Sequence, residues 1–228
     1  MYFLSLKLYD NTIYHISFAY FNIGWLGLPV SIYIFGDIVT PIIIAAYIGG
    51  MFFGSTFVIW LFQKDNSTKI ASLKKLLTAP PFIVFVVALL FKTFYSTITL
   101  DGNLYYFYMF SKFIMSFLGM ALLGIWLQRH PIKKEQIQNI ISFSLMRLII
   151  GVTLFLILFY LFYLFGFIEI KILKYLLIIP FLPVAANIVV LENYYLKSAK
   201  SSSIIAVNTI FSIVFLLIFG IAIKLLGN

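Results

Sequence analysis

The chain has 228 residues, of which 63% are hydrophobic and only 10% are charged. Its mean hydropathy is +1.09. A soluble domain carries roughly 45–50% apolar and about 25% charged residues, so this composition excludes a water-soluble globule. It also excludes a disordered chain, which cannot be this apolar. The absence of cysteine removes thiolate nucleophiles, thiolate metal sites and a disulfide scaffold. We therefore expect an all-α integral membrane protein whose main partner is the lipid bilayer.

The formal net charge is +9 and the isoelectric point is near 9.6. In a soluble protein this balance would suggest nucleic acid, but no basic run here is dense or interleaved with aromatic side chains that could stack on bases. In a membrane protein, excess Lys and Arg instead mark the cytoplasmic loops. We expect no nucleic-acid partner.

Seven segments are long and apolar enough to cross a bilayer, which takes about 20 residues. In chain order they are 12–35, 41–62, 80–98, 104–127, 141–165, 173–195 and 203–225. Polar breaks or breaks marked by Gly and Pro separate them. The expected fold is therefore a bundle of seven transmembrane helices.

The basic residues fall mostly on one side of this arrangement. Ten lie on the side of the amino terminus, namely Lys7, Lys64, Lys69, Lys74, Lys75, Arg129, Lys133, Lys134, Lys197 and Lys200. The other side receives Lys171, Lys174 and Lys224. By the positive-inside rule the amino terminus is cytoplasmic and the carboxyl terminus is outside. The abundance of Ile, Lys, Asn, Phe and Tyr is typical of an AT-rich genome and favours a prokaryotic inner (plasma) membrane.

Two of the seven segments carry helix-breaking residues in mid-membrane. The first contains Asn22, Gly24, Gly27 and Pro29, and the sixth contains Pro180, Pro183 and Asn187. Proline removes a backbone donor and clashes with the preceding turn, and freed carbonyls in lipid must find partners inside the protein. A single kink, or close packing at small residues, is an ordinary structural explanation. Matched breaks in two halves of a chain, however, are typical of the binding site of a secondary transporter.

If the first and sixth segments are equivalent, the repeat has five helices and its two copies lie inverted in the membrane. Residues 1–63 are then the remnant of the first repeat, with its break at Gly27–Pro29. Residues 64–79 form a cytoplasmic basic loop. Residues 80–228 form a complete second repeat, with its break at Pro183. Three helices are missing before residue 12.

Several motifs, in this order, resemble the auxin efflux carrier family, including its bacterial members. They are Asp10–Thr12, Phe21–Pro29 with Phe35-Gly36, Leu73–Pro81, Gly119–Leu127, Leu182–Leu191 and Ser201–Val214. The resemblance implies helices four to ten of a ten-helix carrier with two inverted repeats, in which the fourth and ninth helices cross as broken helices. It also implies carriage of organic anions such as auxin or dicarboxylates by alternating access, and a possible homodimer.

The chain departs from the family pattern in three respects. Helices one, two and most of three are absent, Pro81 stands where plant members often have asparagine, and Gly151 replaces an expected proline. The difference at Pro81 concerns whether the substrate is auxin-like. The absent helices concern whether the chain transports a substrate at all.

For the anion site we single out six residues at the two breaks. Asn22 and Asn187 would contact the substrate through their amides, and Gly24, Gly27, Pro29 and Pro183 would shape the exposed backbone. Broken helix ends offer unpaired N–H groups and a partial positive charge, which suit an anion.

Three other polar residues are not assigned to a functional site. Arg147 lies near the cytoplasmic end of its segment, where we favour snorkelling over a role at the anion. His15 and His130 have no supporting carboxylate cluster, so we expect no metal site and no cofactor.

The sequence therefore predicts a secondary membrane transporter of small organic anions. The main alternative is an N-terminally truncated or split carrier fragment that is inactive without a partner carrying the missing helices. An enzyme is not expected, because the spans contain no Gly-x-Ser-x-Gly elbow, no His-Glu-x-x-His and no paired carboxylates. A lipid-linked sugar flippase is a further alternative, although it would not require the paired breaks.

Overall fold

The computed structural model describes residues 1–62, 77–78, 80–94, 102–129, 132 and 134–226. The protein is all-helical, with 84% helix and no strand in the part described. Two of the described helices are long and apolar enough to cross a membrane, over Gln136–Leu164 and Ser201–Leu225. The expected all-α class is therefore confirmed, whereas crossing by the other five segments stays a prediction. The basic loop expected at 64–79 falls almost wholly outside the described residues.

The first apolar segment is split into two helical halves. A short helix, α1 (Tyr2–Ser5), precedes α2 (Thr12–Ala19), whose amino end is capped by the Asn11 side chain accepting from the Ile13 N–H at 2.8 Å. Residues 20–22 are not helical. The chain then re-enters a helix as the π-turn η1 (Ile23–Gly27) and continues as α3 (Leu28–Phe35).

Our placement of the first break at Gly27–Pro29 is wrong, because the break lies at residues 20–22. Pro29 sits in the first turn of α3. The preceding π-turn has wide hydrogen bonds, from Gly27 N–H to Asn22 C=O at 3.0 Å and from Leu28 N–H to Ile23 C=O. We attribute the continuity to this wide turn, which accommodates a residue without an N–H where a regular α-helix would kink.

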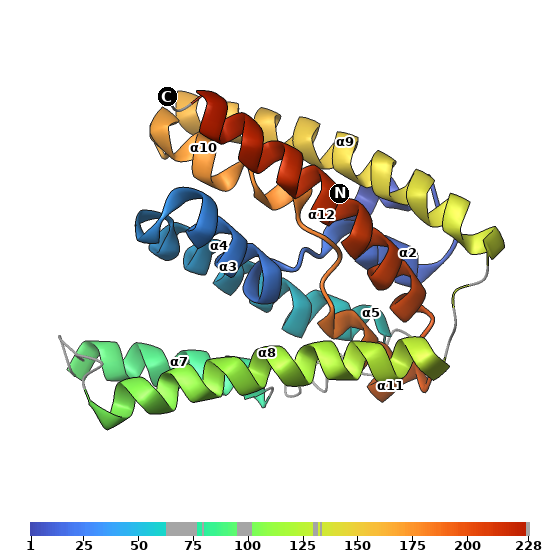
Figure 1. Ribbon diagram of the computed structural model, residues 1–228, viewed down its shortest axis with the longest axis horizontal. Helices are drawn as coiled ribbons and strands as arrows, with labels where there is room; N and C mark the ends of the chain where they lie inside the picture. The colour runs from blue at the N-terminus through green and yellow to red at the C-terminus, as the bar shows by residue number, and fades with distance from the viewer. Residues whose placement is uncertain (63–76, 79, 95–101, 130–131, 133, 227–228) are drawn as a thin grey trace.

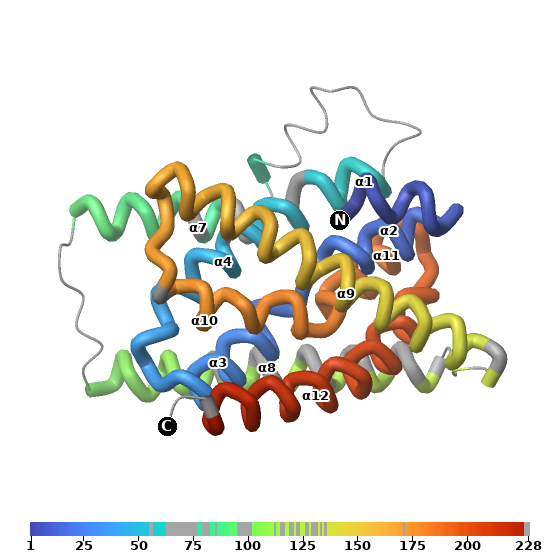
Figure 2. The backbone as a smooth tube through the Cα atoms, turned by 90° about the horizontal axis from the view of Figure 1, so that it is seen from above, coloured from blue at the N-terminus to red at the C-terminus, as the bar shows by residue number. Residues whose placement is uncertain are grey.

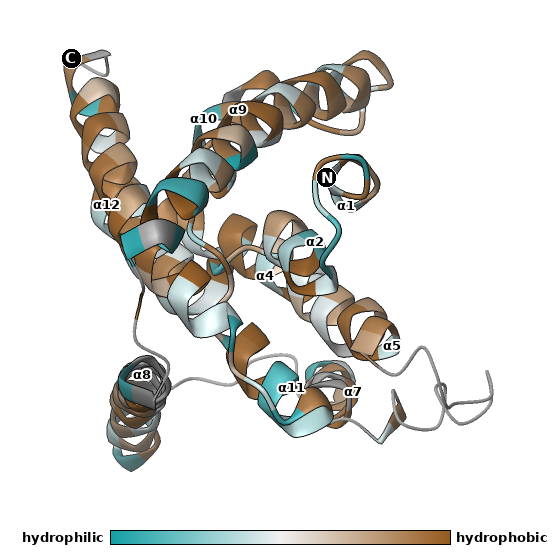
Figure 3. Cartoon of the chain, turned by 90° about the vertical axis from the view of Figure 1, so that its right-hand side faces the viewer, coloured by the Kyte–Doolittle hydropathy of each residue, from teal (hydrophilic) through white to brown (hydrophobic). Residues whose placement is uncertain are grey.

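The second apolar segment is one continuous helical run. It consists of η2 (Asp37–Val39), α4 (Thr40–Phe53), the π-turn η3 (Gly54–Val58) and α5 (Ile59–Phe62). Two antiparallel helices follow, α7 (Pro80–Phe94) and α8 (Asn103–Arg129), as a splayed hairpin whose arms lie apart (Figure 3). We call it the α7–α8 hairpin; α8 contacts α11 and α12.

The carboxyl-terminal part contains two long helices with a second broken segment between them. The long helices are α9 (Lys134–Leu164) and α12 (Ser201–Leu226). The broken segment runs through η4 (Ile170–Ile172), α10 (Leu173–Leu176), η5 (Ile179–Phe181) and α11 (Asn187–Leu196). Its non-helical stretch contains Pro183, so the predicted second break is confirmed.

The helices form three tiers in the ribbon view (Figure 1). The helices α9 and α12 lie at the top, α3, α4 and α5 lie below them, and the α7–α8 hairpin forms the bottom tier. Figure 2 shows α3 and α10 toward one side of the molecule and α2 and α11 toward the other. The ribbons of α9, α12 and α5 are coloured largely as hydrophobic residues in Figure 3, and many large hydrophobic side chains of α9 and α12 are exposed, as expected of helices that face lipid.

The buried core is divided into two clusters. One contains Phe18, Phe143 and Ile188, and joins α2, α9, α11 and the first half of α12. The other contains Ile43, Leu182 and Phe219, and joins η1, α3, α4, η5 and the second half of α12. The first half of one broken segment therefore packs with the second half of the other, and α12 runs along both.

Candidate functional site at the crossing of two broken helices

The two broken segments cross where each is unwound. Phe21 and Val184 form an isolated antiparallel bridge. The N–H of Asn22 donates to the C=O of Pro183 at 2.9 Å, and the N–H of Ala185 donates to the C=O of Tyr20 at 3.0 Å. Each break therefore satisfies part of the other's backbone, which meets the requirement that unwound chain in lipid find partners inside the protein.

Arg147 of α9 supplies the remaining donors on one side of the crossing. It donates from Nε to the Ser17 C=O at 3.1 Å, from Nη1 to the Leu182 C=O at 2.8 Å and from Nη2 to the Pro183 C=O at 3.4 Å. Its guanidinium carbon also lies 4.1 Å from the centre of the Phe21 ring. Arg147 is only 2% exposed. The expectation that it snorkels is wrong, because the backbone carbonyls freed at both breaks hold it in the interior.

A side chain of α12, Asn208, holds the same unwound stretch of the second broken segment. The Asn208 side chain accepts from the Val184 N–H at 2.8 Å and donates to the Ser144 hydroxyl at 2.8 Å. Ser144 lies on α9, three residues before Arg147, so both side chains project from one face of that helix. Asn208 is 1% exposed. Three consecutive residues of the second break, 182–184, are therefore held by side chains from two long helices.

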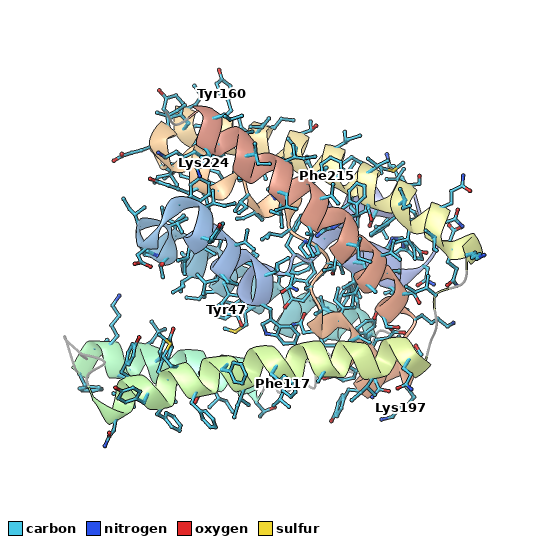
Figure 4. The ribbon with its side chains drawn as sticks, in the orientation of Figure 1. Tyr47, Phe117, Tyr160, Lys197, Phe215 and Lys224 are labelled. Carbon is cyan, nitrogen blue, oxygen red and sulfur yellow. The ribbon has the colours of Figure 1, made fainter. Side chains whose placement is uncertain are left out.

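A cavity of about 160 Å³ borders the crossing, and Arg147 is not among the residues that line it. Residues 20–25 and 185–187 form part of its wall, and Tyr47, Gly50 and Met51 of α4 form the rest. The cavity thus opens beside the start of η1 and the start of α11. Figure 4 shows Tyr47 in the space between α4 and the α7–α8 hairpin.

Three of the six predicted site residues line this cavity and three do not. Asn22, Gly24 and Asn187 are in its wall. Gly27 and Pro29 lie further along the first broken segment, inside helical turns, and Pro183 lies in the bridge itself. The structure therefore brings the predicted amides of Asn22 and Asn187 together at the cavity. It places Pro183 at the crossing and Pro29 inside a helix.

The Asn187 amide is held by a tyrosine that the sequence did not suggest. Its Nδ2 donates to the Tyr20 hydroxyl at 2.9 Å. A Cβ at Gly54 would collide with the same hydroxyl, so the glycine leaves the room that the tyrosine occupies. The Asn22 side chain makes no capping hydrogen bond to its own helix. An amide carries two N–H donors, so both asparagines can donate into the cavity.

Two glycines permit close approach at the crossing. A Cβ at Gly24 would lie 2.5 Å from the Tyr47 ring, and a Cβ at Gly27 would lie 2.6 Å from a terminal carbon of Leu182. Gly24 thus sets the width of the cavity against α4. Gly27 allows the two broken segments to pack together.

The helix ends at the cavity and the helix ends at Arg147 carry partial charges of opposite sign. The first turn of a helix leaves its N–H groups without intrahelical acceptors and carries a partial positive charge, and the last turn carries the opposite. The starts of the Ile23–Phe35 helix and of α11 line the cavity, whereas the carbonyls near the ends of α2 and η5 bind Arg147. The cavity side is therefore suited to an anion.

Other buried polar residues have structural partners away from the crossing. Glu192 is fully buried, and its carboxylate accepts from the N–H groups of Lys200 and Ser201 at 2.8 and 2.9 Å and from the Ser198 hydroxyl. It thereby caps the start of α12. His15 lies 3.3 Å from the Ser5 hydroxyl oxygen, and His130 falls outside the described residues.

Sequence reasoning missed Tyr20, Ser144, Arg147 and Asn208 as parts of this site. A signal was present for the arginine, since a charged residue within an apolar segment marks a functional position by default. Comparison with known proteins adds no assignment, because no family model, curated protein or solved structure matches the chain.

Proposed function

We propose that this protein is a multi-pass membrane carrier of small organic anions that binds a carboxylate in the cavity at the helix crossing. One observation carries the proposal: two helix starts and two asparagine amides, from segments more than 160 residues apart, converge on one cavity of about 160 Å³. Such discontinuous helices, with their positive ends toward an anionic group, are the usual construction of a carrier site.

The chemistry of the wall supports an anion in preference to a cation. Its polar side-chain groups are the amides of Asn22 and Asn187 and the hydroxyls of Tyr20 and Tyr47, and two helices begin in the wall. At these helix starts the N–H of Ile23 already donates to the Phe21 C=O at 3.0 Å and that of Ile188 to the Ala185 C=O at 3.2 Å, so the side chains are the main donors. None of the lining residues is acidic. A carboxylate would accept from these donors, and a cation would find few ligands among them.

The membrane arrangement belongs to the same proposal. Seven helical segments cross the bilayer, the amino terminus is cytoplasmic and the carboxyl terminus is outside. Lys197 and Lys224, which the positive-inside count assigns to opposite faces, lie toward opposite ends of the molecule (Figure 4). The carrier works by alternating access, with the crossing as its fixed site, and a homodimer would resemble the auxin efflux carrier arrangement.

The test is counterflow in proteoliposomes. The purified chain is reconstituted, loaded with indole-3-acetate, benzoate, malonate or succinate, and assayed for uptake of the same labelled acid. We expect uptake of at least one acid, a loss of about tenfold in Asn187→Ala, and no change in Asn139→Ala, which removes an exposed amide on α9. Equal rates in the two variants, or no uptake of any acid above empty liposomes, would contradict the proposal.

A second candidate is a carrier fragment that needs another polypeptide. The observation that favours it is the α7–α8 hairpin, on which nearly every described side chain is exposed, including Phe94 at 79% and Tyr106 at 71%. Under this candidate the chain binds an acid in detergent but shows no counterflow alone. Binding with no counterflow would therefore favour it over the complete carrier.

A further inference from the structure

Arg147 is a buried cation whose partners in the described structure are all neutral. Its three acceptors are the backbone carbonyls of Ser17, Leu182 and Pro183. Among the described residues no carboxylate pairs with it. Carbonyl dipoles satisfy its N–H groups but leave its unit charge uncompensated, and an uncompensated buried charge is costly.

The chain also has few carboxylates that could supply the missing charge. Of its seven acidic residues, only Glu192 lies within a predicted membrane segment. The Glu192 carboxylate already binds three donors at the start of α12. The remaining acidic residues, Asp10, Asp37, Asp65, Asp101, Glu135 and Glu169, belong to the loops and ends of the predicted segments.

The charge of Arg147 lies close to the cavity without entering it. Phe21 is in the cavity wall, and the guanidinium carbon of Arg147 lies 4.1 Å from the centre of the Phe21 ring. The backbone around this ring forms the bridge to Val184. An anion in the cavity would therefore lie near the guanidinium but be separated from it by the Phe21 ring and the crossing strands, in a medium that screens charge weakly.

We infer that the carried anion is the counter-charge of Arg147, and that Arg147 makes the cavity selective for a carboxylate over a neutral ligand of the same shape without touching it. This inference rests on the proposed function and deepens it. Arg147 is thus a positioning and charge-selecting residue. The donors that contact the carboxylate remain the amides and helix starts of the cavity wall.

The experiment measures two ligand pairs of similar shape, in each of which one member is an anion and the other is its neutral amide. Equilibrium binding to the full chain in lipid nanodiscs is measured for indole-3-acetate against indole-3-acetamide and for succinate against succinamide. We expect the unmodified chain to prefer at least one acid over its amide by tenfold or more. Arg147→Gln should reduce that preference to threefold or less, and Arg147→Lys should keep most of it.

A second variant supplies an internal counter-charge while retaining the fold. In Asn208→Asp the side chain keeps the oxygen that accepts from the Val184 N–H. The Ser144 hydroxyl, which donates to the Ile140 C=O at 2.8 Å, can turn to donate to the new carboxylate instead. A carboxylate is thereby added next to the strand that Arg147 holds. We expect acid binding to fall about tenfold and amide binding to stay within twofold, with no change for the exposed control Asn139→Asp.

The outcomes separate the inference from the function on which it rests. If the unmodified chain binds neither acid, the proposed function fails and the inference falls with it. If it binds an acid but Arg147→Gln and Asn208→Asp weaken acid and amide equally, Arg147 is only structural and the inference is overturned while the proposed function stands. A chain that binds acid and amide equally would overturn it as well, whether or not Arg147→Gln folds.

Discussion

The crossing and the α7–α8 hairpin show two opposite ways of using an apolar sequence. At the crossing, side chains from α9 and α12 hold both unwound strands, and Arg147 and Asn208 are at most 2% exposed. On the hairpin nearly every described side chain is exposed. Apolar composition alone therefore does not mark the core. Buried polar residues inside the apolar segments, such as Arg147 and Asn208, mark the part of the molecule whose packing is completed within this chain.

The largest expected effect is the loss of Arg147. Arg147→Ala leaves three carbonyls of the crossing without their donor, and unsatisfied buried groups cost about 1–3 kcal/mol each when relaxation is incomplete. We expect the free energy of unfolding to fall by about 3 kcal/mol or more, measured by SDS-induced unfolding in mixed micelles. A change below about 1 kcal/mol would mean that the crossing does not depend on the arginine.

Glu192→Ala should have the next largest effect. Its carboxylate binds two backbone N–H groups and one hydroxyl at the start of α12, and hydrogen bonds to a charged group contribute about 1.5–3 kcal/mol. We expect a loss of about 2 kcal/mol in the same unfolding measurement. Asp37→Ala, at an exposed carboxylate of the other predicted face, serves as the matched control, and an equal loss there would argue against capping.

Asn208→Ala should cost somewhat less. It removes the acceptor of the Val184 N–H and the donor to Ser144, and we expect about 1–2 kcal/mol because a buried N–H is left unpaired. The matched asparagine Asn139 is exposed on α9, so Asn139→Ala should change the stability by less than about 0.5 kcal/mol. Similar losses in both variants would show that the buried network contributes little.

The smallest effect is expected on the hairpin. Val84 of α7 is 66% exposed, so Val84→Ala removes methyl groups that touch lipid or detergent and leaves no cavity in the protein. We expect a change below about 0.5 kcal/mol in the unfolding measurement. A loss above about 1 kcal/mol would mean that this side of α7 is covered by protein in the membrane, and would sharpen the case for a second polypeptide or a second copy.

The sequence predicted the helical class, and each of the seven predicted segments overlaps helix in the part of the chain that the structure describes, because long apolar runs and their Gly, Pro and polar breaks are local signals. It also predicted the second break, since Pro183 cannot donate in a helix. It misplaced the first break because a wide π-turn accommodates Pro29, and nothing local distinguishes that turn from a kink. The prediction that Arg147 snorkels used only its distance from the end of its segment. The carbonyls that bind Arg147 belong to Leu182 and Ser17, which lie 35 and 130 residues away in the sequence.

Occupation of the cavity at the crossing by an organic anion can be tested directly, because the chain contains no cysteine of its own. Gly50 lines the cavity and has room for a side chain, with Ile23 the nearest neighbour of an added Cβ at 3.5 Å. Gly49 is the adjacent residue of α4, does not line the cavity and has no neighbour within 4 Å. The rate of maleimide labelling is measured for Gly50→Cys and Gly49→Cys with and without indole-3-acetate or succinate. We expect at least one acid to slow labelling of Gly50→Cys several-fold and to leave Gly49→Cys unchanged. Equal rates with and without acid at both positions would show that no acid occupies the cavity.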